Sequence, residues 1–492
     1  MRAIVYNLRS SCAGVKPVEH DLRVRGGIIQ TGSGPLEADL LVRGERISAL
    51  VARDAPAATR EELDAHGRWI LPGLVDMHVH TRVPGYEYKE DFQTASRAAA
   101  VGGVTTFVDM PNVEPPTTTV ELLEQKRELA ARDCHVDWGH FASPRELDQI
   151  PKLAEAGATG FKTFQVGGGY PHDPRLVMSD PAQLYATFDA IAATNLPCVV
   201  HPFSQSLMEY LSEREWAAGE PRDIRTFSKV YTRDVVWSAS IAVLLELQRE
   251  TGARLHLLHT HAPASLELIR QAKTAGLGVS AAIDPKYFHL RGVDLAERGA
   301  RGLPGGFIVE DEERMAAIWS ALDDGTLDVI DSDHAPHTLA DLQRMEADPW
   351  TGPWGGPHLE HLLSLLLTDV HAGRLRLARV VALLSENPAR LLGIYPRKGA
   401  LLPGSDADLV IVDPEREVVP RDEGMESKSA WTPYAGWRLR GTPVLTMLRG
   451  RVIARDGHVL NEPGSGRYIE GRPQRLTRPA PGEPPGLALV PA

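Results

Sequence analysis

The stretch WILPGLVDMHVHTR, residues 69–82, decides how the rest of this chain is interpreted. It is an apolar strand that ends in His78 and His80. Alternate side chains of a strand face the same side, so the two imidazoles point in one direction. Two imidazoles placed in this way at the end of a buried strand can bind one divalent metal ion. Two unrelated histidines would give the same pair, so the rest of the sequence has to separate the two interpretations.

The composition of the whole chain is that of an ordinary globular protein. Of its 492 residues, 43% are hydrophobic and 24% are charged, and this length allows one large barrel domain plus a smaller domain. A net charge of −12 argues against nucleic acid as a partner. There is no apolar run of membrane-spanning length, so no membrane contact is expected, and no secretory signal is visible. Cys12, Cys134 and Cys198 form no disulfide framework, which favours a cytoplasmic location.

The middle of the chain alternates apolar strands with helical stretches. Strand and helix repeat about eight times, which predicts an α/β protein with a (β/α)8 TIM barrel. The connection between Pro202 and Asp234 is longer than a simple loop and is expected to hold extra helices near the site. The expected strands are residues 70–78, 104–110, 135–140, 160–164, 197–201, 254–259, 277–281 and 327–333, and the expected helices include 120–132, 181–193, 235–251 and 263–275.

Both ends of the chain consist of short strands punctuated by glycine. They predict a small composite β-sandwich domain, built from residues 1–70 and 396–492 around a barrel at 71–395. The tail after Asn461 is rich in Pro, Gly and Arg, as in an extended arm or a disordered segment. Ser385 is expected to cap a helix that starts at SENPA. The segment SKSAWTPYAG, residues 427–436, is expected to pack the small domain on the barrel or to form an oligomer contact.

In a barrel of this kind, the reacting groups lie at the carboxyl ends of the strands. Four imidazoles, one lysine and one carboxylate are expected to converge there. This set exceeds the needs of one tetrahedral metal ion and suits two divalent ions. Because the set has no thiolate, zinc is expected first, with manganese, iron or cobalt as alternatives. The residues are His78, His80, Lys162, His201, His259 and Asp333.

Lys162 and Asp333 each allow two interpretations. A neutral lysine amine can react with carbon dioxide to give an anionic carbamate that could bridge two metal ions, and burial favours the neutral amine. The alternative is a lysine that reaches to the barrel rim. Asp333 could take a proton from an attacking water and pass it to a leaving nitrogen, or it could be a solvated loop residue. His334 and His337 come soon after Asp333 in the sequence. Either could lie beside the metal site or contact substrate, or could simply form hydrogen bonds with its local neighbours.

Several segments together resemble the amidohydrolase superfamily, and within it the cyclic amidases: dihydroorotases, allantoinases and hydantoinases or dihydropyrimidinases. The resemblance covers most of residues 20–460. Its segments are DMHVHTRVPG (76–85), KEDF (89–92), AAAVGGVTTFVDMPN (98–112), GFKTF (160–164), SDHAPH (332–337), the run 385–414 and SKSAWTPYAG (427–436).

The resemblance implies a role for each strand-end residue. It assigns His78 and His80 to one metal ion and His201 and His259 to the other. Lys162 would be an N6-carboxylysine that bridges the two ions, and a hydroxide between the ions would attack the ring carbonyl. Asp333 would be both a ligand and the proton shuttle. Relatives are commonly dimers or tetramers, so a homo-oligomer that acts on a small cyclic amide is expected.

Within the family, the dihydroorotase pattern places an Arg, an Asn and a His around a substrate carboxylate. Arg82, Asn112 and His337 match it, and an Arg fork suits a carboxylate. A dihydroorotase-like reaction is therefore expected first, although a surface salt bridge would also explain Arg82. The alternatives are a hydantoinase, dihydropyrimidinase or allantoinase acting on an uncharged or ureido ring, then a non-catalytic scaffold of the family. Deamination of a base is a further possibility that the family segments disfavour.

Three segments depart from the pattern of the relatives. Pro202-Phe203-Ser204 stands where relatives usually carry a nearby Glu. Residues 285–288, PKYF, replace a PHH or PHY segment, and the usual NPPLR stretch is not recognisable around residues 301–308. The ring pocket is therefore expected to differ from that of a dihydroorotase, with Lys286 and Tyr287 as candidate altered contacts.

Overall fold

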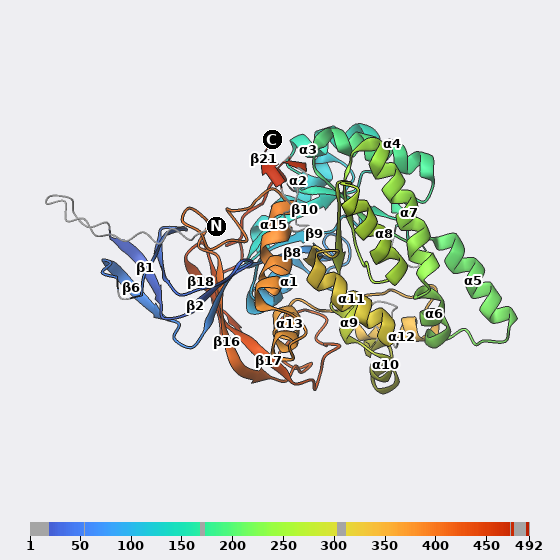
Figure 1. Ribbon diagram of the computed structural model, residues 1–492. Coiled ribbons are helices and arrows are strands. Elements are labelled where there is room, and N and C mark those ends of the chain that lie inside the picture. The colour runs from blue at the N-terminus through green and yellow to red at the C-terminus, as the bar shows by residue number, and fades with distance from the viewer. Residues whose placement is uncertain are drawn as a thin grey trace.

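A computed structural model of the chain describes residues 19–53, 55–167, 173–302, 311–472, 474–476 and 489–491. A barrel with its surrounding helices forms one part of the molecule, and two β-sheets lie at one side of it (Figure 1). Cys12, the N-terminal extension up to residue 18 and residues 303–308 of the expected ring-binding segment lie outside the described residues. In the described part of the chain, no helix is long and apolar enough to cross a membrane.

The barrel is an eight-stranded sheet whose neighbouring strands are all parallel. Its first and last strands meet through a parallel bridge between Val79 and His334, where His80 N donates to His334 O at 2.8 Å. The predicted (β/α)8 architecture is confirmed. In sheet order the strands are β8 (Leu74–Val79), β9 (Val104–Asp109), β10 (Asp137–Ala142), β11 (Gly160–Phe164), β12 (Pro197–His201), β13 (Arg254–Leu257), β14 (Val279–Ile283) and β15 (Val329–Ile330).

Helices follow the barrel strands, and four of those named below begin at a residue whose side chain caps the helix. Asp91 forms a capping box with Thr94 at the start of the first helix, and Asp180 caps the fourth, which has Pro181 in its first turn. Such caps satisfy backbone N–H groups that have no partner inside the helix. The helices are α1 (Phe92–Val101), α2 (Val120–Asp133), α3 (Ile150–Glu155), α4 (Pro181–Thr194), α7 (Asp234–Thr251), α8 (Pro263–Thr274), α11 (Glu312–Asp324) and α13 (Leu362–His371).

Additional helices lie around the carboxyl ends of the barrel strands. The long connection after β12 holds α5 (Gln205–Ala217) and α6 (Ile224–Tyr231), as predicted. The connection after β14 holds α9 (Lys286–His289) and α10 (Gly292–Arg298), and α12 (Leu339–Ala347) follows β15. Short helical turns are η1 (Leu147–Gln149), η2 (Pro174–Leu176) and η3 (Gly299–Gly302).

The β domain combines strands from both ends of the chain, as predicted. Its seven-stranded sheet has the order β19-β18-β17-β16-β7-β2-β3, and its four-stranded sheet has the order β5-β4-β1-β6. Val24 and Leu40 of the smaller sheet pack in one apolar cluster with Ile70 and Leu409 of the larger sheet. The predicted domain boundaries at 70/71 and 395/396 stay predictions. The strands are β1 (His20–Arg25), β2 (Ile28–Thr31), β3 (Gly34–Leu36), β4 (Asp39–Arg43), β5 (Arg46–Val51), β6 (Thr59–Asp64), β7 (Trp69–Pro72), β16 (Leu409–Val418), β17 (Leu439–Leu448), β18 (Arg451–Arg455) and β19 (His458–Val459).

The single strand expected over residues 70–78 is wrong. The chain forms β7 in the β domain, where it pairs with β16, and then β8 in the barrel, where it pairs with β9. Gly73 lies between them, where a Cβ atom would come within 2.2 Å of Thr105 Oγ1. The alternation of apolar residues continues through both strands, so the pattern alone does not reveal the change of sheet.

The helix expected to start at Ser385 is also different. Ser385 lies inside a continuous helical run, in a π-helical turn, and caps nothing. The next segment has Pro388 in its first turn, and proline lacks the N–H that an α-helix would use there. The run consists of α14 (Leu377–Val381), η4 (Ala382–Glu386) and α15 (Asn387–Leu391).

The C-terminal segment up to residue 472 is an extended arm along the barrel. Trp138 N donates to Arg467 O at 3.1 Å, and Ile469 N donates to Trp138 O at 2.7 Å. The arm therefore pairs with the start of β10. Beyond it, β20 (Gln474–Leu476) pairs with β21 (Leu489–Pro491).

Candidate metal centre

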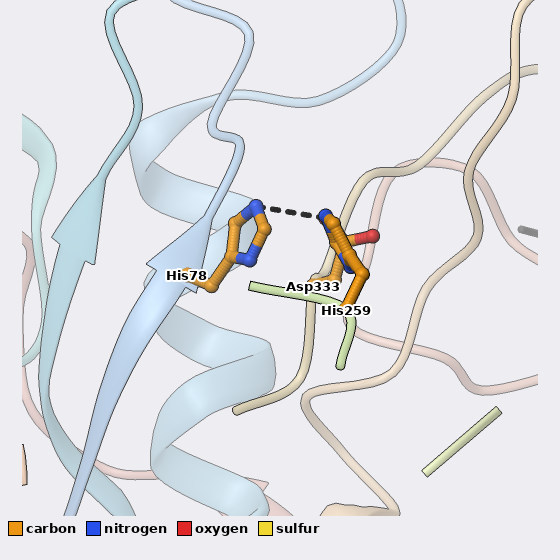
Figure 2. Close-up of side chains that lie close together, drawn as sticks. All are labelled: His78, His259 and Asp333. Carbon is orange, nitrogen blue, oxygen red and sulfur yellow. Dashed lines mark ion pairs between the residues drawn. The ribbon is translucent and has the colours of Figure 1, made fainter. Parts of the chain in front are cut away.

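The six residues predicted from the strand ends meet at one mouth of the barrel. His78 lies in β8, Lys162 in β11, and His201 ends β12. His78 Nε2 and His80 Nε2 lie 3.1 and 3.4 Å from Asp333 Oδ1. The ring centroids of His201 and His259 are 4.4 Å apart, and those of His78 and His259 are 5.1 Å apart. Figure 2 shows His78, His259 and Asp333 pointing toward one another from separate segments.

Two of these residues have an unusual backbone conformation. His259 and Asp333 have φ values of 54° and 42°, in the left-handed region that residues other than glycine seldom adopt. His259 lies two residues beyond the end of β13 and Asp333 three residues beyond the end of β15, so the chain turns there at the mouth of the barrel. Strained backbone of this kind is common at functional sites because the surrounding structure holds it in place.

Burial favours the neutral form of three of the imidazoles, those of His78, His80 and His201, and of the lysine. It holds the pKa values of His78 and His201 well below the ordinary range of histidine, and it lowers the pKa of His80 to about 4. Neutral imidazole is the form that binds a metal ion. Burial also lowers the pKa of Lys162 to about 7, against the attraction of nearby carboxylates such as Asp333.

The donors at this mouth fit divalent metal ions. Donor atoms of His78, His259 and Asp333 all lie within 4.8 Å of one another. Among the described residues, Lys162 Nζ has no hydrogen-bond partner, and the ring nitrogens of His78 make no hydrogen bond although carboxylates of Asp333 and Asp331 lie close to them. Buried polar atoms without partners are costly and need an explanation, and nitrogen and oxygen donors without sulfur suit zinc or a similar ion.

Buried carboxylates behind the donors were not found from the sequence. His259 Nδ1 donates to Asp284 Oδ2 at 2.5 Å, which leaves Nε2 facing the mouth,. Asp331 Oδ1 lies 3.6 Å from His78 Nδ1, and Asp76 accepts from the backbone N of His78. Burial raises the pKa of Asp76 to about 7. In the sequence, these three aspartates are marked only by their position within or just after a barrel strand.

Arg82 and His337, which were predicted to hold a substrate carboxylate, are brought together. Arg82 Nη2 lies 3.1 Å from His337 Nε2, and Arg82 Nε donates to Pro336 O at 3.3 Å. Lys89 Nζ donates to His337 Nδ1 at 3.1 Å. Arg82 is fully buried, so it is not a surface salt bridge. Asn112 is also buried, on the segment that follows β9.

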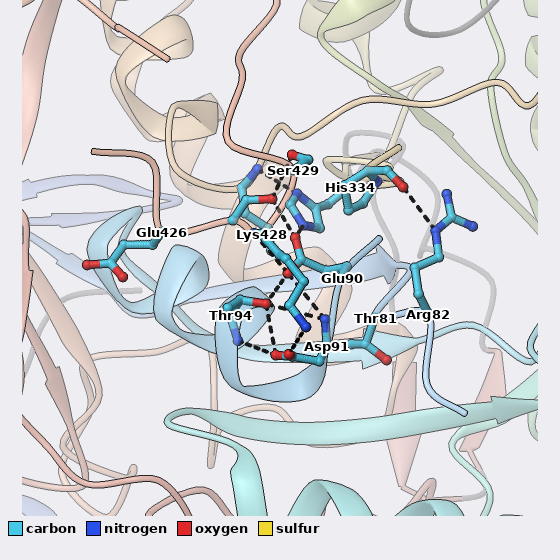
Figure 3. Close-up of polar contacts among 12 residues, drawn as sticks. Thr81, Arg82, Glu90, Asp91, Thr94, His334, Glu426, Lys428 and Ser429 are labelled. Atoms are coloured by element: carbon cyan, nitrogen blue, oxygen red, sulfur yellow. Dashed lines mark hydrogen bonds and ion pairs between the residues drawn. The ribbon is translucent and has the colours of Figure 1, made fainter. Parts of the chain in front are cut away.

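His334 binds Glu90 at the junction between the barrel and the segment 427–429 (Figure 3). The distance from His334 Nε2 to Glu90 Oε2 is 3.2 Å. Glu90 also accepts from the hydroxyls of Ser427 and Thr94. The segment 427–436 therefore packs on the barrel, as one of its two interpretations predicted, and His334 is satisfied locally.

A cavity with about 700 Å³ of empty space, partly open to solvent, leads to the mouth. Three of the six strand-end residues line it: His201, His259 and Asp333. The rest of its lining is mainly aromatic and apolar, and the extra helices α5 and α6 contribute to it. Arg82, Asn112 and His337 are not among its described lining residues. The aromatic residues of the lining are Phe203, Phe227, Tyr231, Tyr287, Trp350 and Trp354.

The fold and the buried cluster place the protein among (β/α)8-barrel enzymes, and comparisons with known proteins identify the family. The model of the amidohydrolase family matches residues 69–453. An L-hydantoinase of Paenarthrobacter aurescens is 34% identical over 92% of this chain and 98% of its own length. An allantoinase of Rubrobacter xylanophilus is also 34% identical, over 92% and 98%. The chain therefore belongs to the amidohydrolase family and is a hydrolase.

A solved structure agrees with this assignment. The L-hydantoinase (dihydropyrimidinase) from Arthrobacter aurescens superposes with a TM-score of 0.86 at 33% sequence identity. The match covers 92% of this chain and all of that chain. The similarity thus extends over the barrel and the β domain together.

Proposed function

We propose that the protein hydrolyses a C–N bond of a cyclic amide in the manner of a hydantoinase or dihydropyrimidinase, on a ring with an apolar, aryl-sized substituent. The similar hydantoinases and the allantoinase favour this alternative over the dihydroorotase-like reaction that the motifs suggested first. The observation that carries it is the aromatic cavity beside His201, His259 and Asp333. Apolar surface gains about 25 cal/mol per Å² when it enters such a lining, whereas a carboxylate would lose its hydration there.

Six residues would hold two divalent metal ions, zinc being the first choice. When bound, the ions would supply a water that is deprotonated near neutral pH and would polarise the ring carbonyl. His78, His80, His201 and His259 would contribute imidazole nitrogens, and Lys162 a carbamate oxygen. Burial lowers the pKa of Lys162 to about 7, so its amine can be neutral near neutral pH. This supports its carboxylation, because only the neutral amine reacts with carbon dioxide.

Asp333 would move the proton during the reaction. Its Oδ1 faces His78 and His80, while its Oδ2 lies 2.6 Å from Lys286 Nζ. A carboxylate in this position can accept a proton from the attacking water and deliver it to the departing ring nitrogen. The expected cytoplasmic location and homo-oligomeric state stay predictions, and light scattering of the purified protein tests the latter.

A dihydroorotase-like reaction is the second candidate. A fully buried Arg82 beside His337 favours it, because a buried guanidinium can bind a substrate carboxylate through two hydrogen bonds. In that case dihydroorotate would be the best substrate.

The experiment compares kcat/KM for benzylhydantoin, hydantoin, dihydrouracil, allantoin and dihydroorotate, using protein of known metal content. We expect benzylhydantoin to be the best substrate of the five. Preference for dihydroorotate would overturn the proposal in favour of the second candidate.

The Phe227→Ala variant tests the aromatic lining. Phe227 stacks on Trp354 with ring centroids 4.5 Å apart, so its loss should reduce kcat/KM for benzylhydantoin about tenfold while hydantoin is largely unaffected. Tyr210→Ala is the matched control, because Tyr210 is an exposed aromatic residue of α5. Equal losses on both rings would show that Phe227 does not recognise the substituent.

A further inference from the structure

A buried lysine contacts the carboxylate that we propose as the proton shuttle. Lys286 begins the short helix α9, two residues after Asp284. Its ammonium donates to Asp333 Oδ2 at 2.6 Å and to Asp284 Oδ2 at 3.1 Å. Lys286 and Asp284 are almost completely shielded from solvent. The mouth of the barrel therefore contains a fixed positive charge supplied by the chain itself.

Asp284 connects this lysine to a second residue of the metal centre. Its Oδ2 accepts from Lys286 Nζ and also from His259 Nδ1, the latter at 2.5 Å. The pair Asp284–Lys286 thus touches both His259 and Asp333. One buried ion pair holds a proposed ligand from the end of β13 and another from the end of β15.

The two oxygens of Asp333 have different neighbours because of this contact. Oδ1 lies close to His78 Nε2 and His80 Nε2, while Oδ2 is held by the ammonium. Rotation about the last side-chain bond of an aspartate is normally soft. A charge-assisted hydrogen bond to one oxygen restricts that rotation, so the other oxygen stays directed at the histidines.

We infer that Lys286, anchored by Asp284, is a positioning residue that keeps Asp333 Oδ1 directed at the metal centre. The inference rests on the proposed function, in which Asp333 is both a ligand and the proton shuttle. The neighbouring Tyr287 lines the cavity and stacks on His261 at 4.9 Å between centroids. The turn that holds Lys286 is therefore fixed by packing on its substrate side.

The test uses Lys286→Met, which removes the ammonium with little change in side-chain length, and Asp284→Asn, which weakens the anchor. Lys273→Met is the matched control, since Lys273 forms a comparable 2.5 Å ion pair with Asp328 away from the mouth. Each purified protein is analysed for metal content, thermal unfolding, kcat and KM, and its cobalt-substituted form for visible absorption. If Lys286→Met does not fold, Lys286→Gln carries the same test, because its side chain is neutral and shorter than that of lysine.

We expect Lys286→Met to lower kcat roughly 10- to 100-fold, the usual cost of losing a group that orients a ligand, with KM changed less than about threefold. Asp284→Asn should show a smaller loss. The cobalt absorption bands should change in Lys286→Met and stay unchanged in Lys273→Met. A purely structural lysine would change thermal unfolding but not the cobalt bands.

Three results would overturn the inference: an unchanged kcat with unchanged cobalt bands, a rise in KM alone, or a loss matched by Lys273→Met. A rise in KM alone would mean that Lys286 contacts the substrate directly. If the wild type hydrolyses none of the rings, the proposed function fails, and the cobalt spectra still decide whether Lys286 orients Asp333.

Discussion

Two buried lysines, Lys398 and Lys162, lie in opposite environments. Lys398 Nζ contacts Asp137 at 2.5 Å, Asp408 at 2.6 Å and Asp406 at 3.1 Å, and so ties the beginning of β10 to the segment that leads into β16. Lys162 Nζ, in β11, has no hydrogen-bond partner among the described residues and lies 4.7 Å from the ring centroid of Phe164.

This difference changes the chemistry of the same amine. Burial alone would lower the pKa of Lys398, but the carboxylates of Asp408, Asp137 and Asp406 outweigh it and raise that pKa above its ordinary value. At Lys162 burial prevails, and the pKa falls to about 7. Lys398 is therefore a permanent cation that joins two domains, whereas Lys162 is an amine that can be neutral and reactive at physiological pH.

The largest expected effect comes from Lys162→Met. Without a bridging carbamate, the protein should lose bound metal, and kcat/KM should fall by more than about 100-fold, beyond the cost of losing a group that only orients a ligand. Thermal unfolding should change little, because the buried amine makes no hydrogen bond to the described residues. Metal analysis and steady-state kinetics check both points. Full activity in this variant would disprove the carbamate.

The opposite outcome is expected for Lys398→Met. Three carboxylates would lose their shared cation, and the free energy of unfolding should fall by about 3–5 kcal/mol. The protein that remains folded should keep its kcat, since Lys398 contacts no residue of the metal centre. Denaturant unfolding and activity at low temperature measure the two quantities. A loss of kcat without a loss of stability would show that Lys398 does not have the purely structural role that separates it from Lys162.

A smaller effect concerns pH. The pKa of Lys162 is lowered below its unfolded value, so the amine is mainly neutral above about pH 7 and mainly an ammonium below it. Only the neutral amine reacts with carbon dioxide, and His80, with a pKa of about 4, does not titrate in this range. At constant dissolved carbon dioxide, zinc should activate metal-free protein roughly tenfold more at pH 8 than at pH 6. Equal activation at both values would contradict the lowered pKa.

The parts of the fold that depend on local pattern could be predicted from the sequence. The bounds of β11 and β12 agree with the expected strands. That the six strand-end residues meet could also be predicted, since the carboxyl ends of the barrel strands share one mouth. Their binding of metal ions stays a prediction. The division between β7 and β8 could not be predicted, because pairing partners are not encoded in the alternation of apolar residues.

The residues behind the site could not be predicted, because their roles depend on neighbours far away in the sequence. Asp284 and Asp331 are ordinary strand-end aspartates until His259 and His78 are placed beside them. Lys398 meets Asp137 across 261 positions of the chain. Arg82 matched a motif, but only its burial excludes a surface salt bridge.

The most direct measurement is X-ray diffraction from crystals of active protein at the zinc absorption edge. We expect two anomalous peaks at the barrel mouth, one beside His78 and His80 and one beside His201 and His259. We also expect extra density on Lys162 Nζ that reaches both peaks. A single peak, or none, together with an unmodified amine at Lys162 in crystals of active enzyme, would contradict the proposed two-metal centre.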